Sequence, residues 1–215
     1  MRVRIRKPAA ERRTEIALAV LRIIGERGLT SLTTATLAEE VGVTSGALFR
    51  HFASLDEILL ETVRHGVRRM DETFPDASLR PRERLMKLAR NRVQLLRSDP
   101  GLAWLLRSEQ AYLTLPDEAV KFLRALVRRS REYLVNVIRE GMSEGSIRDD
   151  IEPQVLLVPV MGTIHALAGM TGVHHLAPGT DTRQQEAVLS ALERMIAPSD
   201  GSSRGRRRTT KRGLY

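Results

Sequence analysis

Cysteine is absent from the 215-residue sequence. Without a thiol the chain forms no disulfide, holds no metal through thiolate and has no cysteine nucleophile, and a cytoplasmic setting is expected. No apolar run approaches the ~18 residues that span a bilayer. The basic start MRVRIRKP is not followed by an apolar segment, so no signal peptide is predicted. Hydrophobic residues at 42% are typical of a chain that buries a core.

Signatures of enzymes and metal sites are also scarce. The sequence contains no phosphate-binding P-loop and no G-x-G-x-x-G turn, and no histidine follows a glutamate at Glu-x-x-His spacing. The adjacent His174 and His175 would diverge on a helix, so no metal site, cofactor or catalytic residue is predicted. His165 lies within an apolar stretch and is interpreted as a core, pocket or interface residue.

The residues that are present favour helices throughout, with no strand alternation, and one stretch organises the rest. Residues 33–52 read TTATLAEEVGVTSGALFRHF. Apolar residues at helical spacing, from Leu37 to Val41, predict a short helix that Gly42 ends. Leu48 and Phe52, four positions apart, predict the buried face of a second helix.

Two short helices around a tight turn are the layout of a helix-turn-helix, whose second helix lies in the major groove of DNA. Residues expected at the DNA surface are small, hydroxyl-bearing, aromatic or basic. They are Thr33, Thr34, Thr44, Ser45, Gly46, Ala47, Phe49, Arg50 and His51. The alternative is an ordinary pair of core helices.

The residues of this region are more specific than its helix-turn-helix pattern. GALFRHFASLDEILL resembles the end of the DNA-binding domain of the tetracycline-repressor (TetR/AcrR) family, in which Leu–Tyr–x–His–Phe precedes a helix opening in Ser–Lys–Glu. GLTSLTTATLAEEVGVTSG resembles the earlier half of the same domain. The resemblance covers about residues 10–70, and the remainder matches in length and helix layout. It implies an all-α protein of about nine helices, with a three-helix DNA-binding domain and a C-terminal bundle for effector binding and dimerisation.

Three positions depart from the family pattern. Phe49 stands where the family usually has tyrosine, and Leu55 where it usually has lysine, and both changes delete a phosphate contact. Ala35, in the first helix of the pair, offers no polar group. Leu55 either packs against a neighbour or faces the DNA backbone.

The chain around this domain reads as further helices. A helix over 9–27 precedes it, and the S-x-x-E pair of Ser54 and Glu57 opens the helix after it. Later helices are expected from Pro81, from Asp99, from 117 to about 143 after Thr114, and from Pro153, with Pro159 kinking or interrupting the last of these.

Composition and the resemblance together divide the chain into four parts. They are a basic N-terminal arm at 1–9, the DNA-binding domain at 10–70, an effector-binding and dimerisation domain at 71–197, and a basic, disordered tail at 198–215. The formal net charge is +9, and the tail holds six arginines and lysines against one aspartate. Basic ends suggest polyanion contact, although a solvated tail is the alternative.

The resemblance places an effector pocket in the middle helices. Aromatic and polar candidates for its wall are Trp104, Arg107, Tyr112, Phe122, Tyr133, Asn136 and His165. The resemblance implies that the last two apolar helices pair across a two-fold axis, and the alternative is that both are monomer core. Candidates for that interface are Gly162, Ala166, Gly169, Val188, Leu192 and Ile196.

These features and the resemblance predict a homodimeric, sequence-specific DNA-binding transcriptional regulator associated with the nucleoid. It is expected to be a repressor that a small, largely apolar effector releases from a pseudo-palindromic operator. An architectural DNA-binding dimer without an effector is the main alternative, and a helical enzyme or carrier is the third. The specificity ratio between one operator and random DNA separates them.

Overall fold

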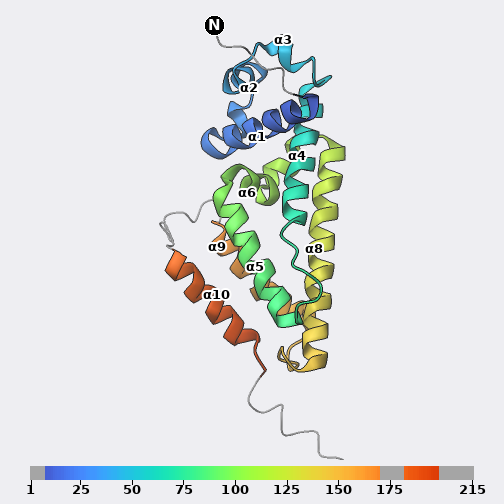
Figure 1. The fold of residues 1–215 in the computed structure, drawn as a ribbon, viewed down its shortest axis with the longest axis vertical. Helices are drawn as coiled ribbons and strands as arrows, with labels where there is room; N and C mark the ends of the chain where they lie inside the picture. Colours follow the sequence, from blue (N-terminus) through green and yellow to red (C-terminus); the bar gives the residue numbers. More distant parts are fainter. Residues whose placement is uncertain (1–7, 170–181, 199–215) are drawn as a thin grey trace, which may run out of the picture.

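The computed structural model describes residues 8–169 and 182–198, and every regular element within them is a helix (Figure 1). The elements are α1 (Ala9–Arg27), the 3-10 turn η1 (Leu29–Ser31), α2 (Thr34–Val41), α3 (Ser45–Leu48), α4 (Leu55–Asp71), α5 (Pro81–Ser98), α6 (Pro100–Arg107), α7 (Glu109–Thr114), α8 (Asp117–Glu144), α9 (Pro153–Leu167) and α10 (Thr182–Ile196). The predicted all-α class is confirmed. The basic arm, the tail and the His174–His175 pair lie outside the described residues, apart from the arm's last two residues and the tail's first.

Local chemistry sets several helix ends where the sequence predicts them. Ser54 caps α4, because its Oγ accepts a hydrogen bond from the Glu57 amide at 3.1 Å. The Glu57 carboxylate reaches back and accepts from the Ala53 amide at 2.6 Å. Pro81 occupies the first turn of α5. Gly145 ends α8 with a left-handed φ of 79°.

Three helices differ from the predicted pattern. The second helix of the helix-turn-helix is regular only to Leu48, because tighter bonds such as His51 N–H to Leu48 O, at 3.0 Å, replace the α-helical ladder. Thr114 ends the additional helix α7 and does not open α8. Helix α9 continues through Pro159, which removes one amide donor without ending the helix.

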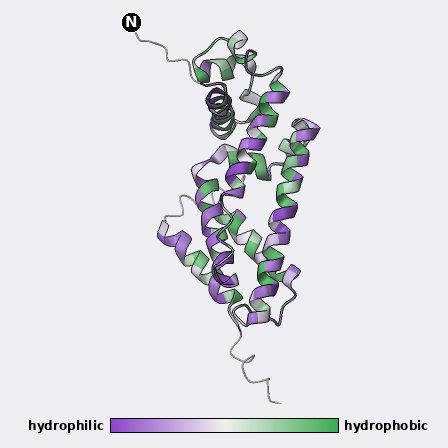
Figure 2. Cartoon of the chain, turned by 45° about the vertical axis from the view of Figure 1, so that its right-hand side comes forward, coloured by the Kyte–Doolittle hydropathy of each residue, from purple (hydrophilic) through white to green (hydrophobic). Residues whose placement is uncertain are grey.

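The buried side chains form two clusters stacked along the molecule. The first, the upper core, joins α1–α4 to α6, α7, the last turn of α5 and the first half of α8, with Ile23, Leu48 and Leu105 among its members. The second, the lower core, joins α5, the second half of α8, α9 and α10, and includes Leu88 and Val160. Hydrophilic and hydrophobic residues alternate along the helices accordingly (Figure 2). The first cluster crosses the predicted domain boundary near residue 70, so the N-terminal helices share a core with the body.

Two glycines bring α1 and α6 into backbone contact. A Cβ added at Gly101 would lie 1.9 Å from the carbonyl oxygen of Leu21, and one added at Gly25 would lie 2.7 Å from the amide nitrogen of Gly101. No other residue type fits at Gly101 unless the two backbones separate. This contact fixes the N-terminal helices on the body, where α1 lies across α6 (Figure 1).

Alanine at Gly101 tests the contact. We expect Gly101→Ala to lower the free energy of unfolding by about 1–3 kcal/mol, because the methyl group overpacks the crossing. Urea unfolding of the protein without DNA measures the change. The matched control is Gly46→Ala in α3, where an added Cβ meets nothing within 4 Å and a gain of up to roughly 1 kcal/mol is expected. Equal effects of the two substitutions would refute the close approach.

Candidate nucleic-acid interface

Helices α2 and α3 form a compact pair whose turn is fixed at both sides. Thr33 caps α2 by accepting from the Thr36 amide at 3.1 Å, and Thr36 Oγ1 accepts from the Thr33 amide at 2.9 Å. Gly42 then ends α2 with a φ of 70°. Thr44 caps α3 by accepting from the Ala47 amide at 3.3 Å. The angle between the two helices is therefore set by side chains on the same short stretch.

The predicted DNA-facing residues lie on one end of the molecule, remote from α10 (Figure 1). Those that are exposed to solvent are Thr33, Thr44, Ser45, Gly46, Phe49 and Arg50. Those that are half-buried are Thr34, Ala47 and His51. The inward pair, Leu48 and Phe52, is buried as predicted. The pair thus presents small and hydroxyl-bearing groups to solvent, while its apolar side chains are buried behind them. This is the arrangement that a helix binding in the major groove needs.

Arg13 of α1, which the sequence did not single out, ties this pair to α4. Its Nη1 donates to the carbonyl of His51 at 2.6 Å, and its Nη2 donates to Glu57 Oε1 at 2.9 Å. The guanidinium also lies 4.1 Å from the centroid of the Phe52 ring. The Ala53 amide, followed by Arg13, holds the pKa of Glu57 below its ordinary value. One side chain therefore joins α1, the end of the α3 turn and the start of α4.

A second arginine of α1, Arg12, lines a groove of about 310 Å³ between α1 and α3. Thr44, Ala47, Arg50 and His51 line the same groove. Arg12 donates to Glu15 at 2.8 Å along its own helix and makes no bridge to α3 or α4. It therefore adds a positive charge beside the predicted recognition surface, where phosphates approach a helix-turn-helix.

The three departures from the family pattern have different surroundings. Phe49 is 45% exposed at the end of α3, and Ala35 is exposed on α2. Leu55 is half-buried and packs against the upper core. Of the two alternatives for Leu55, packing against neighbours agrees with its position.

Three of the predicted effector-pocket residues come together near the α1–α6 crossing. Trp104 and Arg107 line a cavity of about 290 Å³ between α1, α5, α6 and the end of α9. Arg107 Nη1 donates to the carbonyl of His165 at 3.3 Å. Burial, followed by the charge of Arg107, lowers the pKa of His165, so the imidazole is neutral at pH 7.

The other four candidates lie elsewhere. Tyr112 and Phe122 pack against the upper core. Tyr133 belongs to the lower core and meets Phe74 edge-on, with ring centroids 4.8 Å apart. Asn136 is exposed on α8 and does not line the cavity beside Trp104. The seven residues do not share a cavity, because α6, α7 and α8 direct them into separate layers.

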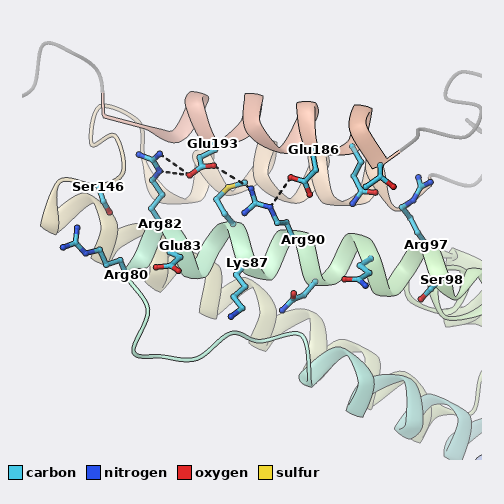
Figure 3. A pocket seen from close by; sticks show the side chains of 15 residues that line it. Arg80, Arg82, Glu83, Lys87, Arg90, Arg97, Ser98, Ser146, Glu186 and Glu193 are labelled. Carbon is cyan, nitrogen blue, oxygen red and sulfur yellow. Dashed lines mark hydrogen bonds and ion pairs between the residues drawn. The ribbon is translucent and has the colours of Figure 1, made fainter.

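A larger groove of about 1040 Å³ lies between α5 and α10 (Figure 3). Nearly all of its lining residues are charged or polar, with Met86 the exception, and ion pairs cross it. Arg82 meets Glu193 at 3.2 Å, and Arg90 meets Glu186 at 3.4 Å. These pairs hold α10 against α5, and the groove does not have the apolar wall that was predicted for an effector pocket.

The predicted dimer residues divide between surface and core. Gly162 and Ala166 of α9 and Val188 of α10 are exposed. Leu192 and Ile196 are buried in the chain's own lower core, so they are not available to a second subunit. Gly169 lies beyond α9 with a φ of 83° and is not part of the helical stripe.

Exposed apolar residues that the sequence did not single out extend this surface. Val155 and Val158 continue the α9 stripe toward its start, and Met195 continues the exposed face of α10. Counting back four and seven positions from Gly162 would have found both valines.

Across residues 8–169 and 182–198, no group of three or more histidine, aspartate or glutamate side chains is arranged to hold a metal ion. Within the same ranges, no helix is long and apolar enough to cross a bilayer.

Comparison with known protein families matches two regions of the chain. The model described as bacterial regulatory proteins of the tetR family matches residues 16–62. The model described as the tetracyclin repressor-like C-terminal domain matches residues 78–169.

Individual proteins are similar over most of the chain. The transcriptional repressor KstR2 of Rhodococcus jostii is 26% identical over 67% of this chain and 72% of its own length. The nucleoid occlusion factor SlmA of Marinobacter nauticus is 31% identical over 66% of this chain and 72% of its own length. Among solved structures, AibR in complex with isovaleryl coenzyme A and operator DNA has a TM-score of 0.70 at 18% identity, covering 86% of this chain and 98% of AibR. This last likeness concerns the fold alone.

The two neighbouring arginines of α1 give a matched test of the interface. We expect Arg13→Met to lower the urea midpoint of unfolding, because the α3 turn and α4 lose their common partner. DNA affinity should fall at every salt concentration, with an unchanged slope of log affinity against log salt. We expect Arg12→Met to leave the midpoint unchanged but to flatten that slope by ~0.9, because one phosphate contact is lost. The reverse assignment of the two effects would contradict these roles.

Proposed function

Because the chain belongs to the TetR family of DNA-binding transcriptional regulators, we propose that it is a homodimeric repressor of a pseudo-palindromic operator. The observation that carries the proposal is the capped α2–α3 pair, which presents Thr44, Ser45 and Gly46 at the end of the molecule. Base edges in the major groove would meet these residues, and Thr33, Arg50 and Arg12 would bind phosphates on either side.

Two subunits would meet through α9 and α10. Exposed apolar or small residues recur along α9 at Val155, Val158, Gly162 and Ala166, which is one helical face. Val188 and Met195 stand seven apart on the neighbouring helix. Exposed valines and methionine in such an array favour a partner surface. Two-fold symmetry would then place one α3 in each of two successive major grooves.

Release by a small effector is the second part of the proposal. AibR is described in complex with both isovaleryl coenzyme A and operator DNA, which supports a ligand-responsive mechanism for this chain. The cavity beside Trp104 touches α1 through Ile24 and Gly25. A ligand there would act directly on the contact that orients the N-terminal helices, and it would release DNA only by binding the released state more tightly.

An architectural role is the second candidate, and the similarity to SlmA, a nucleoid occlusion factor, favours it. A polar α5–α10 groove in place of an apolar effector pocket agrees with the same alternative. The two roles differ in sequence specificity and in their response to metabolites.

Genome-wide footprinting of the purified protein, with and without a metabolite extract of the cell, separates the two roles. We expect protection at one or a few palindromic sites, affinity at least ~10³-fold above that for random DNA, and loss of protection with the extract. Broad protection that the extract leaves unchanged would favour the architectural role.

An arginine at Val158 tests the dimer. Val158 is 69% exposed on α9, and Val127 is 50% exposed on α8. An unpaired arginine buried at an interface costs several kcal/mol, so Val158→Arg should raise the dimer dissociation constant by at least roughly 100-fold. We expect Val127→Arg, the matched control, to sediment like the unmodified dimer. The proposed interface would be contradicted if the unmodified protein sedimented as a monomer. It would also be contradicted if the Val158→Arg variant remained dimeric.

A further inference from the structure

Arg92 of α5 is a buried cation that DNA binding does not use. Its side chain is 3% exposed, and it lies with two of the other buried polar residues of the described chain, Thr73 and Ser130. Its Nε donates to Thr73 Oγ1 at 3.3 Å, and its Nη2 donates to Ser130 Oγ at 2.8 Å. The guanidinium also lies 5.1 Å from the centroid of the Phe74 ring. All these partners are neutral.

The charge of Asp71 stabilises the charged form of Arg92, but the Asp71 and Glu140 carboxylates are hydrogen-bonded to other arginines. Asp71 accepts from Arg129 Nη2 at 2.9 and 3.1 Å, and Glu140 accepts from Arg84 Nη2. In the described part of the chain no carboxylate forms an ion pair with Arg92. Burial lowers the pKa of Arg92 to about 10, so the group still carries its charge at pH 7. A desolvated charge without a counter-ion is costly, and its retention calls for an explanation.

Two further donors beside Arg92 lack an acceptor. The Tyr133 hydroxyl and Arg84 Nε are both buried without a hydrogen-bond partner. Tyr133 lies one helical turn after Ser130 on α8, and Arg84 lies about two turns before Arg92 on α5. Burial raises the pKa of the Tyr133 hydroxyl. The charges of Arg84 and Arg92 lower this pKa, and the charge of Glu140 raises it. Two cations and a phenol therefore line one seam between α5 and α8. Glu140 already accepts from Arg84 there, whereas Arg92 has no anionic acceptor bonded to it.

We propose that this seam is a receptor for the carboxylate of an amphipathic organic acid, with Arg92 as its main ligand. A planar guanidinium matches a carboxylate through two parallel hydrogen bonds, which neither hydroxyl partner provides. The apolar part of the acid would lie against the rings of Phe74 and Tyr133 and the lower core behind them. The inference rests on the proposed function in that this acid acts as an effector, at a second site separate from the cavity beside Trp104.

The residues that cover this seam connect it, through α4, to the DNA-binding end of the molecule. Thr73 and Phe74 follow the end of α4, and they are the groups that meet Arg92 from that side. Asn91 also holds this segment by donating to the Thr73 carbonyl at 3.0 Å. An acid that binds Arg92 replaces Thr73 and Phe74 there and frees the last turn of α4, whose first turn is tied to the α3 turn by Arg13.

Acids and amides of the same carbon skeleton test the charge requirement on the full-length protein without DNA. Calorimetric titration at pH 7 compares phenylacetate with phenylacetamide, and hexanoate with hexanamide. We expect each acid to bind at least roughly tenfold more tightly than its amide, which is the value of a charge-assisted hydrogen bond. Equal binding of acid and amide, or no binding of either acid, would overturn the proposal.

Variants then locate the site. We expect Arg92→Met to abolish the preference for acid over amide and Arg92→Lys to weaken acid binding roughly tenfold, because the bidentate geometry is lost. The matched control on the same helix is Arg90→Met, which removes a groove arginine and should leave acid binding unchanged. Tyr133→Phe deletes only the orphaned hydroxyl, and it should weaken the acids several-fold and spare the amides even if Arg92→Met does not fold. Acid binding that survives in Tyr133→Phe and in a folded Arg92→Met would place the acid elsewhere.

Operator release is measured separately, by adding phenylacetate to the protein–DNA complex. Acid binding without release would remove the effector role and leave the carboxylate receptor standing. Release by a metabolite extract that contains no acid able to bind Arg92 would leave the proposed repressor function standing and remove the receptor from it.

Discussion

The backbone contact between α1 and α6 is the constraint on which the rest of the arrangement depends. With Gly101 and Gly25 at the crossing, the helix-turn-helix pair α2–α3, here the recognition pair, cannot turn relative to α5–α10 unless two backbones separate or slide. The shared upper core has the same effect, because it runs from Leu48 behind α3 to Leu105 in α6. A ligand that acts on the body therefore reaches the DNA-binding end through a packed, discrete arrangement rather than through a flexible linker.

Helix α4 spans this arrangement, and its two ends are held by different chemistry. Arg13 ties its first turn to the α3 turn through a carboxylate and a carbonyl at the edge of solvent and through the buried ring of Phe52. Arg92 holds the residues that follow its last turn, through a hydroxyl and a ring in the interior. The first set is a satisfied cluster and should be rigid. The second contains an uncompensated charge, and an anion would stabilise a different arrangement there.

Sequence reasoning succeeded where the signal is local. The cap at Ser54, the left-handed glycine at Gly145 and the inward pair of the helix-turn-helix all depend on neighbours within one or two turns. It did not find Arg13, Arg92 or the Gly101 contact, because each depends on a partner brought close only by folding. Leu192 and Ile196 were assigned to a dimer interface because an amphipathic stripe does not say which apolar surface will cover it. For α9, the exposed Val155 and Val158 mark an apolar surface that the single chain leaves uncovered, and the proposed dimer would cover it.

The most direct test of the account is the distance between the two recognition pairs of a dimer. The chain has no cysteine, so Glu39→Cys, at an exposed position of α2, gives one spin label per subunit for pulsed electron resonance. The account predicts a narrow separation on operator DNA that corresponds to successive major grooves, roughly 34–36 Å between the recognition pairs, and a different separation when phenylacetate is bound. The account would be contradicted by one distribution of distances between the labels that is the same in the free, operator-bound and acid-bound protein. It would also be contradicted if no distance between two labels were detected on the operator.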